Sequence, residues 1–177
     1  MAATVVINRL TGSGPTKTVI SGGTTRFHTA DTGAADTNTP LPIPTSGTTY
    51  SYWCATRLEC TSAPALGINN IKWYTDGANG FGTGISLKVQ TATGYVQATG
   101  TSGTTGNILN TTNYSTLAGA TVNAFTYTSG SPLSVSGTLG ATTGDFGDYV
   151  VSQLEAGTTS LPGPTPAESM TFRYDEF

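Results

Sequence analysis

Charged side chains are scarce in this chain of 177 residues. Asp, Glu, Lys and Arg make up 10% of it, against roughly 25% in an ordinary soluble domain. Seven basic and ten acidic residues give a net charge of −3. There is therefore no basic surplus to attract nucleic acid or an anionic lipid surface, and we expect partners other than nucleic acid and membranes.

The side chains that usually carry catalysis are also few. His28 is the one histidine, and it lies in the polar stretch "RFHTAD", where we expect a solvated or hydrogen-bonded ring rather than a zinc ligand. A nucleophile elbow of the form G-x-S-x-G does not occur in the sequence. We therefore expect no enzyme, and predict no catalytic, cofactor-binding or metal-binding residue.

Only two cysteines are present, Cys54 and Cys60. If both lie on one strand, six residues of extended chain separate them by ~20 Å, whereas a disulfide needs Cα atoms within about 7 Å. We expect two buried thiols, which suits synthesis in a reducing compartment. The start, "MAATVVINRLTGSG", lacks the pattern of a secretory signal, and no run reaches the ~20 apolar residues of a membrane span.

Thr, Val, Ile and aromatic residues are plentiful instead, which argues against disorder and favours strands. Turn residues bound each candidate strand. The predicted strands cover residues 4–10, 17–20, 49–60, 70–75, 84–92, 94–100, 124–129, 132–139, 148–157 and 169–177. The sequence therefore predicts one all-β domain over 1–177, an antiparallel β-sandwich of jelly-roll or Ig-like type with about ten short strands and little helix.

Alternation supports this prediction. Over 84–90 the apolar side chains alternate with polar ones, and the same holds over 170–175, so each strand has one packed face and one wet face. Trp53 and Trp73 fall in predicted strands, where we expect them in the core. Residues 107–121 are the best place for a short helical turn, with a plain loop as the alternative, and 98–106 is a predicted surface loop.

Residues 21–46 contain three prolines and few apolar side chains. A structureless stretch of this length is unusual in a compact domain, so we expect either an extended arm lying on a neighbouring molecule or a long functional loop. Its segment "TPLPIPT" favours stiff polyproline geometry. A second proline-rich segment, "LPGPTP", spans 161–166.

Two glycine-rich stretches could be ligand loops or turns. "DGANGFGTG" (76–84) leads into a strand rather than a helix and lacks the closing Lys of a P-loop, so we predict a turn. Phe81 at its tip either folds back on its own domain or enters a partner. "TTGDFGDYV" (142–150) carries Phe146 between Asp145 and Asp148. Two carboxylates beside glycines could form a weak cation site, but we favour two turn-forming aspartates.

Phrases spread over most of the chain resemble a known group of proteins. They are "TVVINRLTG…KTVISGGTTRFHTAD", "NNIKWYTDGANGFGTG" and "GDFGDYVVSQLE…TPAESMTFRYDEF". This resemblance is to small virion-associated proteins of tailed bacteriophages, the decoration or auxiliary head proteins, which are often β-sandwiches or jelly rolls. It implies a structural protein displayed on a virion and made in the host cytoplasm, and it carries over no catalytic residue.

The leading hypothesis is thus a virion structural protein that decorates or cements a capsid lattice. Its expected partners are copies of itself, in closed oligomers such as trimers, and a major capsid or other virion protein. The alternative is a carbohydrate-binding or adhesin-like sandwich, which needs exposed Trp or Tyr. The residues that we expect at the interface share a place in the long loop or at an aromatic loop tip: Phe27, His28, Pro42, Pro44, Phe81 and Phe146.

Overall fold

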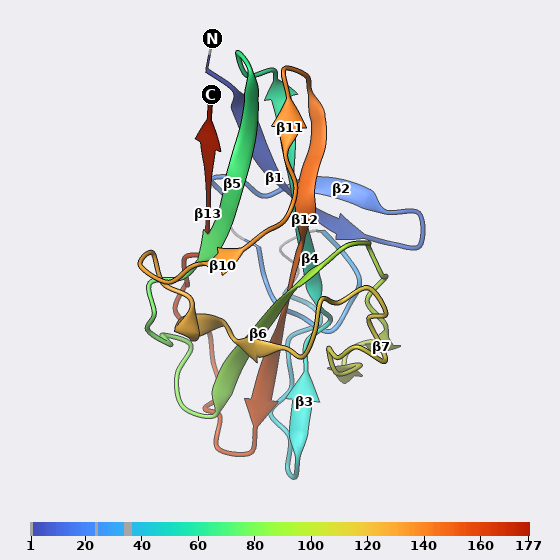
Figure 1. Ribbon diagram of the computed structural model, residues 1–177. Coiled ribbons are helices and arrows are strands. Elements are labelled where there is room, and N and C mark those ends of the chain that lie inside the picture. Colours follow the sequence, from blue (N-terminus) through green and yellow to red (C-terminus); the bar gives the residue numbers. More distant parts are fainter. Residues whose placement is uncertain (1, 24, 34–36) are drawn as a thin grey trace.

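The protein is all-β in the computed structural model, which describes residues 2–23, 25–33 and 37–177 (Figure 1). Every strand pairing in these ranges is antiparallel, as predicted. The strands are β1 (Thr4–Thr11), β2 (Thr16–Val19), β3 (Thr48–Tyr50), β4 (Cys54–Ser62), β5 (Gly67–Tyr74), β6 (Ile85–Ala92), β7 (Gly100–Thr101), β8 (Thr105–Gly106), β9 (Val122–Asn123), β10 (Leu133–Ser134), β11 (Leu139–Gly140), β12 (Gly144–Gly157) and β13 (Thr171–Glu176). One 3-10 turn, η1, spans Ala124–Thr126.

The larger sheet has the order β2-β1-β4-β12-β6-β9, and β3 pairs with the far end of β12. The long strand β12 runs along its middle (Figure 1). The register of β12 against β4 shifts between Phe146 and Val150. Gly147, with φ of 72°, lies in this bulge, where a residue with a side chain would be strained.

The smaller sheet is built around β5. β13 pairs with one edge of β5, while β10 and β11 pair with the other edge at its two ends. Trp73 of β5 thereby lies between Phe172 of β13 and Leu133 of β10. This sheet is shorter than β12, so it covers only part of the larger sheet (Figure 1).

The main core lies between the two sheets. Its buried side chains include Trp73, Leu87, Val89 and Val150, each no more than 2% exposed. Leu87 and Val89 follow the predicted alternation of β6, and Trp73 is in the core as predicted. Burial of each such side chain contributes about 1.5–3 kcal/mol, which makes this interface the main source of stability.

A second core lies on the opposite face of the larger sheet, under residues 93–121. Tyr114 is fully buried there, with its ring 5.4 Å from that of Trp53. The Trp53 indole donates a hydrogen bond to the Val96 carbonyl. Val151 of β12 is buried beneath them. β12, for which the sequence predicts no alternation, is therefore buried on both faces, because a long loop covers the second one.

Several predicted elements differ from the structure. Residues 94–99 form no strand, and 124–126 form the 3-10 turn because the Asn123 side chain accepts a hydrogen bond from the Phe125 amide. Of 132–139, only β10 and the first residue of β11 are strand. Residues 107–121 form turns rather than a helix, and the predicted strand 49–60 is broken at Ser51–Trp53.

Candidate functional site

The long loop 21–46 lies against its own domain where the structure describes it. Arg9 of β1, 1% exposed, donates hydrogen bonds to the Thr25 hydroxyl and to the Arg26 carbonyl. The Asp31 carboxylate accepts from the Gly12 amide and from the Gln97 side chain. The described part of the segment is therefore packed on its own domain through these contacts. Residues 24 and 34–36 of this loop lie outside the described part of the chain.

His28 is buried at the centre of this loop, at 1% exposure. Its Nδ1 accepts a hydrogen bond from the Ala30 amide, and its Nε2 lies 3.5 Å from the Arg9 guanidinium. Its carbonyl accepts from the Tyr52 amide. The ring is therefore the hydrogen-bonded histidine that the sequence predicted. Its burial removes it from any contact with a partner in this conformation.

The glycine-rich stretch 76–84 is a turn, as predicted. Asp76 and Asn79 each accept a hydrogen bond from the backbone amide two residues on, and the Asn79 amide group donates to the Ile85 carbonyl. The side chain of Phe81 folds back on its own domain and is 8% exposed. Its ring meets Phe27 and Phe125 edge-on, at centroid distances of 6.4 and 6.1 Å.

The expectation of a turn with an aromatic tip at 142–150 is wrong. Phe146 lies within β12, is 2% exposed and packs edge-on against Tyr174. Asp145 is also in the strand, and its carboxylate binds Lys17. This hydrogen bond is the main reason that the pKa of Lys17 is raised.

Asp148 does not share a site with that pair. Burial raises the pKa of the Asp148 carboxyl, and the nearby Arg57 opposes that rise. The Arg57 guanidinium itself donates to the Gly147 carbonyl and lies over the Tyr149 ring. Among the described residues, no three His, Cys, Asp or Glu side chains come together to hold a metal ion.

The remaining predicted interface residues are Phe27, Pro42 and Pro44, all half-buried. Phe27 lies on the wall of a large cavity, while the Pro42 carbonyl accepts a hydrogen bond from the Thr49 hydroxyl. The structure thus brings Phe27 and Phe81 together inside the domain, but it places Phe146 in a separate part of the core.

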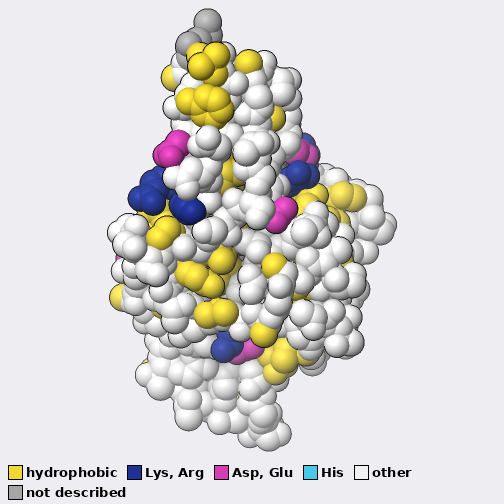
Figure 2. Space-filling view, viewed as in Figure 1, with side chains coloured by type: hydrophobic (Ala, Val, Ile, Leu, Met, Phe, Trp, Pro, Cys, Tyr) yellow, Lys and Arg dark blue, Asp and Glu magenta, His cyan; other side chains and the backbone are white. Residues whose placement is uncertain are grey.

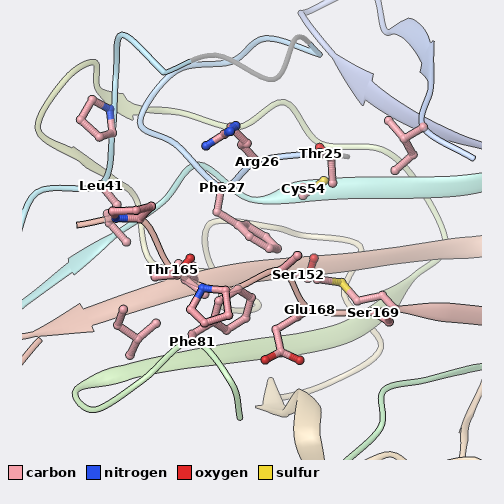
Figure 3. Close-up of a pocket in the computed structure, with 18 of the residues that line it drawn as sticks. Thr25, Arg26, Phe27, Leu41, Cys54, Phe81, Ser152, Thr165, Glu168 and Ser169 are labelled. Atoms are coloured by element: carbon pink, nitrogen blue, oxygen red, sulfur yellow. The ribbon is translucent and has the colours of Figure 1, made fainter. Parts of the chain in front are cut away.

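The cavity has a volume of about 970 Å³ and lies where the smaller sheet leaves the larger one uncovered. Figure 3 shows its floor, with Cys54 from β4 and Ser152 from β12. Its walls come from two proline-containing segments, the loop 20–43 and residues 160–170. No pattern in the sequence predicts this cavity, because its walls come from segments that are over a hundred residues apart.

Apolar side chains dominate the cavity lining. Arg26 and Glu168 are its two charged side chains, and they project from opposite walls in Figure 3. The Cys54 thiol is free and buried, as is Cys60, so the prediction of two buried thiols is confirmed. A cavity with so few titratable groups can hold an apolar molecule, but it presents no paired acid and base.

No protein-family model, curated protein or solved structure matches this chain. The resemblance to phage virion proteins therefore stays an expectation. No helix in the described ranges is long and apolar enough to span a membrane.

One end of the molecule presents apolar side chains to solvent. Leu66 and Phe177 are 68% and 55% exposed, and the Leu66 amide donates to the Phe177 carbonyl. The Phe177 ring lies over Gly67, where an added Cβ would come within 2.8 Å of it. Figure 2 shows hydrophobic side chains at this end and few charged side chains on the face in view. We call Leu66 and Phe177 the apical pair.

Proposed function

We propose that this protein is a structural component of a virion that decorates or cements a capsid lattice. It is made in the host cytoplasm and acts by binding copies of itself, in a closed oligomer such as a trimer, and a major capsid or other virion protein. Catalysis has no part in this proposal.

The apical pair is the observation that carries the proposal. Two large apolar side chains held together by backbone hydrogen bonds at one end of a stiff β-scaffold are suited to a protein contact. Full burial of a Leu or Phe side chain contributes about 1.5–3 kcal/mol, so burial of the exposed parts of both would contribute about 2–4 kcal/mol per subunit. Such a contact is weak alone, but a closed oligomer repeats it and raises the avidity.

The sheet edges offer a second kind of contact. β13 pairs with β5 on one side, and no described strand pairs with its other side. A free edge can add a strand from another protein through main-chain hydrogen bonds. The carbohydrate-binding alternative has less support, because it depends on exposed Trp or Tyr. Trp53 and Trp73 are 3% and 2% exposed, and every Tyr is buried or half-buried.

The test is binding of the purified protein to virions that lack it. We expect Leu66→Asp and Phe177→Asp to reduce binding at least tenfold, because a charge replaces a buried apolar contact. Val19→Asp is the matched control, since Val19 is a 60% exposed apolar residue on β2. Equal binding by all three variants and the native protein would refute the role of the apical pair.

A further inference from the structure

The cavity between the larger sheet and the two proline-containing segments is not used by the proposed virion contacts. We propose that it binds a fatty acid, with the acyl chain inside the cavity and the carboxylate at Arg26. This proposal is independent of the virion proposal. It is based on the volume, the lining, the covering segment and the charge of the site.

Volume and lining favour an apolar ligand. At about 970 Å³ the cavity reaches the upper part of the range of small-molecule sites, roughly 300–1,000 Å³. Its apolar lining includes the side chains of Phe27, Leu41, Phe81, Leu154 and Met170. Burial of each CH₂ group of an acyl chain in this lining favours binding.

Two of the hydroxyl groups in the lining are already hydrogen-bonded within the protein, which leaves fewer partners for a sugar or a peptide. The Thr56 hydroxyl already donates to the Val150 carbonyl, and the Thr25 hydroxyl already accepts from Arg9. A sugar or a peptide brings many donors and acceptors, and each one buried without a partner costs about 1–3 kcal/mol. An acyl chain brings none, so the lining suits it better.

The segment over the cavity provides a route of entry. We call residues 161–169 the proline-rich strap; they make no hydrogen bond to other described residues. Three of them, Pro162, Pro164 and Pro166, have no amide hydrogen to donate. The strap can therefore move away from the cavity without breaking a hydrogen bond, and a ligand can enter without disturbing either sheet.

Charge selects a carboxylate as the head group. Arg26 is exposed at the cavity wall, and its guanidinium makes no ion pair within the described part of the chain. Glu168 projects from the opposite wall (Figure 3) and would repel an anion placed there. A carboxylate beside Arg26, with its acyl chain directed into the cavity, pairs with the guanidinium and stays away from the Glu168 carboxylate.

The experiment measures displacement of a fluorescent fatty acid, dansyl-undecanoate, from the full chain by palmitate. We expect saturable binding that palmitate displaces and that maltotriose does not. Ser152→Phe and Ala156→Phe place a bulky ring in the cavity floor. Each should weaken binding about ten- to a hundredfold, because overpacking costs roughly 1–3 kcal/mol. Two separate positions are used in case one variant fails to fold, and circular dichroism checks each.

A second arm tests the head group. Arg26→Gln should weaken palmitate binding about two- to fivefold and leave hexadecanol binding unchanged, since an exposed ion pair contributes up to about 1 kcal/mol. Arg173→Gln, an exposed arginine on β13 outside the cavity, is the control. The proposal is overturned if palmitate fails to displace the probe, if folded floor variants bind as tightly as the native protein, or if both arginine variants lose the same affinity.

Discussion

Replacement of Phe81 by alanine distinguishes a core side chain from an interface side chain. In the structure the Phe81 ring is 8% exposed and packs edge-on against Phe27 and Phe125. Core Phe→Ala changes cost about 3–5 kcal/mol. Because the surrounding turn 76–84 is exposed and can partly collapse, we expect the lower end, about 3 kcal/mol. For a chain of this length, that corresponds to a fall in Tm of about 6–12 °C.

The assay is thermal and urea unfolding of the isolated protein followed by Trp fluorescence. Phe177→Ala is the matched control: its ring is 55% exposed, and we expect a change within about 1 kcal/mol. If Phe81→Ala unfolds with the same Tm as Phe177→Ala, the Phe81 ring is not part of the core. Loss of particle binding by a fully stable Phe81→Ala variant would instead place the ring at an interface.

Three further predictions concern a glycine, a buried amide and a carboxyl. Gly84→Ala should lower the free energy of unfolding by about 2 kcal/mol more than Gly82→Ala. Both positions have positive φ, but only at Gly84 would the new Cβ come within 2.5 Å of the Ser160 amide nitrogen. Gln153→Leu should lower the free energy of unfolding by about 3 kcal/mol and speed hydrogen exchange at the Leu109 amide. The buried Gln153 side chain accepts a hydrogen bond from that amide and donates to the carbonyls of Ser51 and Asn107. Asp148→Asn should raise stability slightly at neutral pH, and the gain should vanish as pH falls below 3.8.

The pH dependence expected for Asp148→Asn follows from the raised pKa of the Asp148 carboxyl. Burial raises the folded-state pKa of Asp148 above its ordinary value of 3.8, so the fold favours the protonated carboxyl. Native stability contributed by this group is therefore present at low pH and is lost as pH rises through the folded pKa. A larger gain for Asp148→Asn at pH 3 than at pH 7 would contradict this reasoning. The glycine prediction is contradicted if Gly84→Ala and Gly82→Ala have the same free energy of unfolding. The Gln153→Leu prediction is contradicted if hydrogen exchange at the Leu109 amide does not change.

The strands with a regular alternation could be predicted from the sequence. β6 buries Leu87 and Val89, and β13 packs the half-buried Phe172 and Tyr174 against the core, and the period of two makes both patterns visible without any knowledge of neighbours. For β12, the sequence predicts only the last ten of its fourteen residues, 148–157. Its start, Gly144 to Gly147, contains glycines that suggested a turn, but an added Cβ at Gly137 would come within 2.7 Å of the Gly147 Cα. These glycines permit a bulge and a close approach of backbones, which the local sequence does not distinguish from a turn.

Long-range packing explains the remaining differences. Tyr95 and Val96 suggested a strand at 94–100, yet both side chains pack on the outer face of the larger sheet. The Tyr95 hydroxyl donates to the Gly12 carbonyl 83 residues away. His28 and Phe81 are buried for the same reason, since their partners Arg9 and Phe125 lie far along the chain. The cavity depends on how the loop 20–43 and the strap come together. Only the length and proline content of these segments, not their meeting point, could be predicted.

Quantification of this protein in purified virions tests the central claim most directly. Virus particles from an infection in which the chain is expressed are separated on a density gradient, and the amount of the chain is measured relative to the major capsid protein. Our account predicts that the chain sediments with intact particles in a fixed ratio that does not change on further purification. It is contradicted if the chain stays in the soluble fractions, or if its ratio to the capsid protein falls towards zero with each gradient.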